Sequence, residues 1–383
     1  MKNIVKKPMY HFLLVLTIAS AAGLHGWRTL YNNFAVETAG LDGFHIGIIQ
    51  SFRELPGFLA LCAVFFFYFM REQTLSVFSV IIMGIGIAIT GFLPSFSGLL
   101  ATTLIMSFGF HYYETTNQSL VLQHFDEYQS PLVMGRQRSI MSLVCLIVGT
   151  LIFICSKFLS FKVMFLLIGV YVCGAGIWGL FNRPSCLPAK KQTRRFALKK
   201  KYAFFYILTL LSGARRQIFM VFSVLLLVKK FGFTVSQITL LFVINNIINY
   251  FSAPMVAKAI RRFEEKPVLN TEYISLIIIF TLYAFSTNKW FTASLYILDH
   301  ITFNGSMAIR TYFQKIADKD DIASSTAVSF TINHAAAIIL PAFGGFLWMI
   351  NYRIPFFMGS AIAVCSLICT QFIKRDQNKA SIS

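Results

Sequence analysis

The basic run RPSCLPAKKQTRRFALKKK, residues 183–201, separates two halves of the chain that have the same layout. Each half contains hydrophobic stretches with polar breaks between them. A membrane-spanning helix needs about 20 mostly apolar residues, and six stretches of this kind precede the run while six follow it. The predicted spans are 10–34, 45–69, 74–94, 97–122, 133–156 and 160–181 in the first half, and 202–228, 234–257, 268–287, 290–313, 323–349 and 353–373 in the second.

The composition excludes an ordinary soluble domain. Of the 383 residues, 56% are hydrophobic and 13% are charged, whereas soluble domains average roughly 45–50% apolar and about 25% charged residues. Helices are favoured over barrel strands, because barrel strands are only about 10 residues long and alternate in polarity. We therefore predict an all-α membrane protein with twelve transmembrane helices in two six-helix halves. Its predicted parts are an N-terminal bundle (1–181), a basic cytoplasmic linker (182–201) and a C-terminal bundle (202–383).

The net charge of +19 predicts the orientation of the helices. Lys and Arg of membrane proteins collect in cytoplasmic loops. When the twelve spans are threaded through a membrane, most of the 34 basic residues, including Arg136 and Arg138, fall on the side of the N-terminus. We therefore expect a multi-pass protein of the inner (cytoplasmic) membrane with both termini in the cytoplasm. Its expected partners are the lipid bilayer and a small-molecule or ion substrate, and no nucleic acid is needed to explain the charge.

This layout resembles that of the major facilitator superfamily. The resemblance covers essentially the whole chain and rests on the two halves, the basic linker, the polar first helix with GWRTLYNNF (26–34) and PAFGG (341–345) in the eleventh helix. It implies a secondary transporter in which helices 1, 4, 7 and 10 line the substrate path and the halves rock about a central site. We expect such a transporter to be a monomer without a cofactor.

The chain departs from the family pattern in two places. Between the second and third helices, FMREQ (69–73) lacks the glycine and the aspartate that precede the arginine-rich turn of the family. A related pattern in the second half is AKAIRRFEEK (257–266), where Arg261 and Arg262 are expected to make charge contacts at the cytoplasmic gate. Helix 5 lacks the Gly-Pro-rich signature of the family's drug/proton antiporters, which argues against a multidrug exporter.

Few ionisable residues lie deep in the predicted helices, and their cost in a membrane makes them candidates for function. They fall on helices 1, 2, 4, 7 and 10. His111, Glu114 and Gln118 share one face of helix 4, as Arg28 and Asn32 do on helix 1, because their spacing matches the helical repeat. The expected substrate-binding residues are Arg28, Asn32, Arg215, Arg216, Gln217 and Asn304. The expected proton-coupling residues are His111, Glu114, Asp299 and His300. Gating or structural roles are expected for Arg53, Glu54, Arg261 and Arg262, the first two as an ion pair just before Pro56 in helix 2.

The arginines of the path predict an anionic substrate, because a guanidinium group binds carboxylate or phosphate oxygens in bidentate fashion. Arg28, Arg215 and Arg216 outnumber the two acids Glu114 and Asp299. We therefore expect a transporter that moves a small anion by alternating access and is coupled to protons. Glu114 is the first candidate for the proton carrier, because burial and neighbouring groups can tune a carboxyl group to titrate during a transport cycle.

Two other functions remain open. Four histidines and two acids near the middle of the membrane could bind a transition-metal ion or its chelate as substrate, although they lie on separate helices. These residues are His25, His111, His300, His334, Glu114 and Asp299. A non-transporting membrane sensor or assembly factor could use the same fold, because a fold does not fix function. An enzyme is not expected, since the sequence has no nucleophile elbow, phosphate-binding loop or paired-histidine motif, and no resident metal is predicted.

Overall fold

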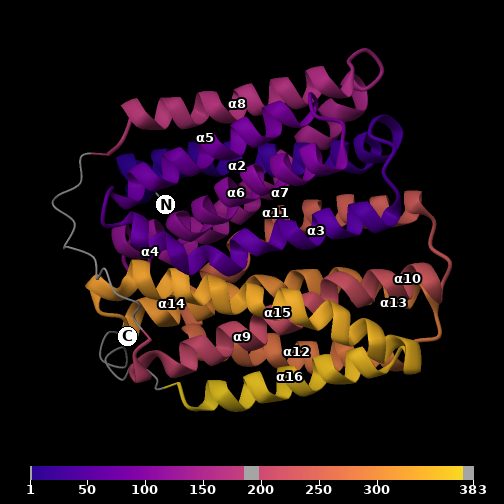
Figure 1. The fold of residues 1–383 in the computed structure, drawn as a ribbon. Coiled ribbons are helices and arrows are strands. Elements are labelled where there is room, and N and C mark those ends of the chain that lie inside the picture. The colour runs from indigo at the N-terminus through magenta and orange to yellow at the C-terminus, as the bar shows by residue number, and fades with distance from the viewer. Residues whose placement is uncertain (1, 185–197, 374–383) are drawn as a thin grey trace.

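The structure, a computed structural model, describes residues 2–184 and 198–373. Most of the predicted linker lies outside these residues. Within the described part of the chain, the short helix α1 (Lys2–Val5) precedes twelve helical spans in the predicted order (Figure 1). The prediction of an all-α membrane protein with twelve transmembrane helices is confirmed.

Six spans form the first half of the chain. They are α2 (Pro8–Asn33) with η1 (Phe34–Thr38), α3 (Gly43–Phe58) with η2 (Leu59–Cys62) and α4 (Ala63–Phe66), α5 (Glu72–Thr90), α6 (Phe96–His124), α7 (Ser130–Cys155) and α8 (Phe161–Phe181). The second half begins with η3 (Lys200–Tyr202). Its spans are α9 (Ala203–Gln217) with η4 (Ile218–Ser223) and α10 (Val224–Lys229), α11 (Val235–Phe263), α12 (Glu265–Phe285), α13 (Lys289–Thr302) with η5 (Phe303–Ser306) and α14 (Met307–Ile316), α15 (Ile322–Ile350) after η6 (Lys319–Asp321), and α16 (Ile354–Gln371).

Nine helices of the described residues are long and apolar enough by themselves to cross a membrane. Helix α6 is not one of these nine, and it carries the polar side chains of His111, Glu114 and Gln118. The span made by α13, η5 and α14 is not one of them either. The spans with the weakest membrane signal are therefore among those that carry the candidate site residues.

Several spans change their helical type part-way. The first and seventh spans contain the π-helical segments η1 and η4, and the tenth contains the 3-10 segment η5. In the second span, Pro56 lies inside α3, which passes into the 3-10 segment η2 three residues later. Proline removes one backbone hydrogen bond and crowds the preceding turn, so Pro56 weakens the turn of α3 that precedes it.

The two halves contact each other mainly through long helices. Helix α7 packs against α11, and α15 packs against both α3 and α6. Figure 1 shows α2, α5 and α8 stacked on one side of these contacts and α9, α12 and α16 on the other. Residues from both halves therefore meet in the middle of the molecule, where a site between them can form.

The contact between α5 and α6 depends on glycine. A Cβ atom added to Gly109 would collide with the backbone of Ser79 and Met83. We expect Gly109→Val to push the two helices apart and to lower the free energy of unfolding by about 1–3 kcal/mol, the usual cost of overpacking. Thermal unfolding of the purified protein in detergent measures this loss. Gly149→Ala is the control, because no heavy atom lies within 4 Å of the added carbon, and an equal loss in both variants would contradict the packing argument.

Candidate functional site

A cavity of about 160 Å³ lies between the two halves of the protein. Helix α6 contributes His111, Glu114 and Gln118, and α7 contributes Arg138. The second half contributes residues of α9, of the tenth span and of α15. They include Arg216, Arg310 and His334. Of the helices that the resemblance assigns to the substrate path, the fourth, seventh and tenth thus border this cavity.

Among the residues that the structure describes, the cavity wall carries three guanidinium groups and one carboxylate. Glu114 interacts electrostatically with Arg310, Arg138 and Arg216, but none of the three forms an ion pair with it within the described residues. The Glu114 side chain is half-buried. Its charge is therefore balanced only at a distance, and the wall as a whole is positively charged.

Arg138 is held in place by residues of the tenth span. Its Nη1 donates to Oδ1 of Asn304 at 3.0 Å, and its Nη2 donates to the hydroxyl of Ser306 at 3.1 Å. Asn304 in turn donates to Oδ1 of Asn249 at 2.7 Å. The predicted substrate-binding residue Asn304 thus lies directly behind the cavity wall, where it orients a guanidinium group.

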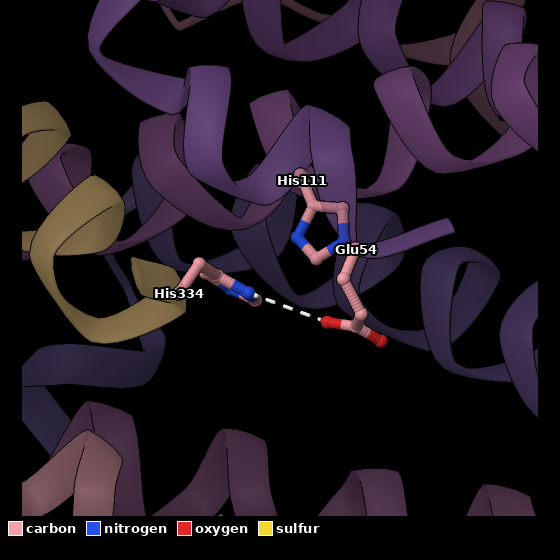
Figure 2. A group of neighbouring side chains, drawn as sticks. All are labelled: Glu54, His111 and His334. Carbon is pink, nitrogen blue, oxygen red and sulfur yellow. Dashed lines mark ion pairs between the residues drawn. The ribbon is translucent and has the colours of Figure 1, made fainter. Parts of the chain in front are cut away.

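At the edge of the cavity, three side chains from three helices approach one another (Figure 2). Glu54 of α3 lies 3.4 Å from Nδ1 of His334 of α15, measured from its Oε2 atom. The ring of His111 of α6 meets the ring of His334 edge to face, with centroids 4.6 Å apart. Arg53 donates to the other oxygen of Glu54 at 2.8 Å. The structure thus contains the ion pair that we expected between Arg53 and Glu54, and it adds two histidines.

Gly57 makes room for this group of side chains. A Cβ atom at this position would lie 2.7 Å from Cγ of His334. The glycine that follows Pro56 therefore lets the histidine of α15 reach across to α3.

A second buried group of charges lies apart from the residues that line the cavity. Arg215 forms an ion pair with Glu272 at 2.8 Å, and their side chains are only 4% and 2% exposed. The guanidinium group also lies over the ring of Tyr273. Asp299 is buried as well, and it interacts electrostatically with both members of the pair.

We expect the pair between Arg215 and Glu272 to be essential for stability. Removal of one partner leaves a buried charge without compensation, which costs about 3–5 kcal/mol. Arg215→Met alone should therefore lower the free energy of unfolding by about this amount, whereas Arg215→Met with Glu272→Met should recover most of it. Urea or thermal unfolding in detergent measures both variants. A double variant no more stable than the single one would contradict the pairing.

The remaining predicted residues do not line the cavity. Arg28 and Asn32 are exposed on α2, and Gln217 is half-buried on α9. The ring of His300 packs on Phe219 at 5.7 Å. The gating candidates Arg261 and Arg262 are exposed at the end of α11.

Two charged residues, Arg138 and Glu272, lie in the interior although the sequence did not lead us to expect them there. Arg138 was expected on the cytoplasmic side, but it lies eight positions into α7, or about 12 Å along the helix at 1.5 Å per residue. Glu272 was not expected among the buried acids, but it lies seven positions into α12. The depth of both residues follows from where their helices begin, at Ser130 and at Glu265.

Comparison with known proteins identifies the family. A sequence model of the Major Facilitator Superfamily matches residues 13–341, with a further match over residues 205–382. The chain belongs to the Major Facilitator Superfamily. The resemblance inferred from the layout is thereby confirmed, and with it a multi-pass membrane protein of a transporter class. The comparison with curated protein sequences finds no match.

Solved transporter structures share the fold of this superfamily member. The E. coli fucose:proton symporter FucP matches with a TM-score of 0.76 and 12% identity, over 96% of this chain and 98% of that chain. A bacterial homologue of the iron transporter ferroportin, in an outward-facing state, matches with a TM-score of 0.74 and 13% identity, over 95% and 98%. The human organic anion transporter MFSD10 matches with a TM-score of 0.71 and 12% identity, over 95% and 99%. At these identities the likeness concerns the fold alone.

Proposed function

We propose that this protein is a secondary transporter that moves a small anion by alternating access and couples this movement to protons. One observation carries the proposal: Arg138, Arg216 and Arg310 face the central cavity, where Glu114 supplies the single carboxylate found among the described residues. Arg216 and Arg310 have no ion-pair partner within 4.0 Å among the described residues. Guanidinium groups without a fixed partner are suited to bind carboxylate or phosphate oxygens in bidentate fashion.

The structure changes the membership of the proposed binding site. Arg216 keeps the substrate-binding role that the sequence suggested. Arg138 and Arg310 take the places of Arg28 and Arg215, because they line the cavity and the other two do not. The volume of about 160 Å³ fits a small organic or inorganic anion.

Proton coupling is assigned to Glu114. A carboxyl group that borders the cavity and lacks an ion pair can exchange a proton without first breaking a salt bridge. The positive charges of Arg138, Arg216 and Arg310 act on the Glu114 carboxyl group. Bound anion would neutralise part of this positive charge and thereby favour protonation of Glu114, which links the two events.

The two bundles, residues 1–181 and 202–383, are proposed as the units that move. At the end of the bundle where α6 and α14 terminate, the Gln314 amide of α14 donates to the backbone oxygens of Leu122 and Phe125. This contact joins the two halves between the cavity and the end of the molecule where α6 and α14 terminate. It must break when the transporter opens at that end. Lys199 and Lys201 lie at the same end, in agreement with a cytoplasmic location of this end in the inner membrane.

Transport by the full-length protein in liposomes tests the proposal. Inorganic phosphate, sulfate and small mono- and dicarboxylates serve as labelled solutes, with and without an inward proton gradient. We expect at least one anion to accumulate, and the gradient to increase its accumulation. Accumulation of neutral sugars or metal ions in place of anions would contradict the anion assignment, and the movement of no solute at all would favour a sensor or assembly factor.

The proposed metal cargo receives less support. Of the six ligands expected from the sequence, only His111, Glu114 and His334 line the cavity. His25 lies beside Cys145, while Asp299 belongs to the buried charge group around Arg215. The structure therefore does not gather the expected ligand set, and we retain the anion as the substrate.

A further inference from the structure

Glu54, His111 and His334 have the chemistry of a transition-metal site. One ligand atom from each of them lies within 4.8 Å of the other two. Two imidazole nitrogens and one carboxylate oxygen form a set that suits Zn²⁺ and similar ions, with metal–nitrogen distances of about 2.0–2.1 Å. Tetrahedral coordination at this distance places neighbouring ligand atoms roughly 3.4 Å apart, so a side-chain movement of about 1 Å would complete the site.

The two histidines have unused ligand atoms. Both rings are almost fully buried, with 4% exposure for His111 and 5% for His334. Nδ1 of His111 lacks a hydrogen-bond partner among the described residues, and Nδ1 of His334 has only the 3.4 Å ion pair with Glu54. A buried polar atom without a partner is costly. A metal ion between these side chains would give the imidazole nitrogens a stronger partner.

The positive neighbours limit the affinity but leave a ligand atom free. Arg53 occupies Oε1 of Glu54, and Arg216 also acts electrostatically on His334. The second oxygen of Glu54, Oε2, is the atom that faces His334. We therefore expect the two imidazoles to be the main ligands and Oε2 of Glu54 to be the third.

The three ligands come from both halves of the transporter. Glu54 and His111 belong to the first half and His334 to the second. Near this group, the amide of Leu61 donates to the hydroxyl of Thr331 at 2.9 Å, which ties η2 of the second span to α15. A metal ion coordinated by all three side chains would add much stronger bonds across the same contact.

We infer that Glu54, His111 and His334 form a transition-metal site that bridges the two halves and, when occupied, holds them together and stops transport. Metal binding does not depend on the proposed function. The inhibition of transport does rest on the proposed function, since alternating access needs the halves to rock against each other.

Zn²⁺ binding to the full-length, tag-free protein in detergent tests the site. Isothermal titration should give one saturable Zn²⁺ per chain, and Zn²⁺ should raise the thermal unfolding temperature by mass action. Both effects should be lost in His111→Ala and His334→Ala. They should persist in His11→Ala, a matched control whose histidine is exposed on α2. Gly57→Ala provides a second test that keeps all three ligands, because its methyl group would displace the His334 ring, and we expect at least tenfold weaker binding.

Uptake by liposomes tests the consequence of binding. Zn²⁺ should block anion uptake by the wild type, EDTA should restore it, and Gly57→Ala, which keeps every side chain of the cavity wall, should be at least tenfold less sensitive to Zn²⁺. Absence of saturable binding, or unchanged binding in both histidine variants, would overturn the site. Binding without inhibition, or accumulation of Zn²⁺ inside the liposomes, would overturn the bridging role. If no anion is transported by any variant, the proposed function fails, while the titration still decides whether the metal site exists.

Discussion

Glu114→Gln is expected to abolish uptake driven by a proton gradient while exchange of the anion between the two sides of the membrane continues. Glutamine keeps the size and hydrogen-bonding capacity of the protonated side chain but cannot bind or release a proton. Because Glu114 borders the cavity without an ion pair in the described chain, its replacement breaks no salt bridge. The three arginines that we propose to bind the anion remain in place.

The size of this effect distinguishes coupling from binding. Gradient-driven accumulation should fall at least tenfold, to the level reached without a gradient. Exchange of labelled for unlabelled anion at equal pH on both sides should change by less than about twofold. Lys229→Gln is the control for a changed charge, because Lys229 is exposed at the end of α10 and outside the cavity. Unchanged gradient-driven uptake by Glu114→Gln would show that another group carries the proton.

Arg216→Gln is expected to weaken anion binding by about 2–4 kcal/mol, or roughly 30- to 1,000-fold, as for the loss of one partner of a buried charge pair. Arg216 lines the cavity and its Nε has no hydrogen-bond partner among the described residues. The protein therefore loses few internal contacts when it is replaced. Arg216→Lys should recover only part of the affinity, because an ammonium group cannot bind an oxyanion in bidentate fashion.

The neighbouring arginine provides the matched contrast. Arg215 forms its ion pair with Glu272 away from the cavity, so its variants should lower stability and leave the affinity of the folded protein nearly unchanged. Arg216 variants should lower the affinity and leave the stability nearly unchanged. Anion affinity from titration and stability from thermal unfolding separate the two cases. Similar losses of affinity in both would mean that Arg215 also contacts the substrate.

Much of the fold could be predicted because the membrane restricts it strongly. A hydrocarbon layer requires that each spanning segment satisfies its own backbone hydrogen bonds, so the length of each apolar stretch, such as 160–181, determines a helix. The number of spans and their order followed from these lengths alone. The polar pattern of α6 was also visible, because His111, Glu114 and Gln118 repeat at helical spacing.

The contacts between helices could not be predicted in the same way. Arg215 and Arg216 are adjacent in the sequence and looked equivalent, but consecutive residues of an α-helix point about 100° apart. One therefore meets Glu272 of α12 and the other faces the cavity. Arg138 looked like a loop residue until the depth of α7 and its contact with Asn304 were known.

The sequence by itself determined that this protein folds in a lipid bilayer and which segments form its helices. It also determined which charged residues these helices carry. Only the tertiary structure decided which of those charges share a cavity, because the rotation of each helix about its axis depends on packing with its neighbours. Glu54 and His334 are 280 positions apart in the chain and meet only because α3 crosses α15 at Gly57. Hydrophobic length is a local property of the sequence, whereas the meeting of three side chains from three helices is a property of the packed molecule.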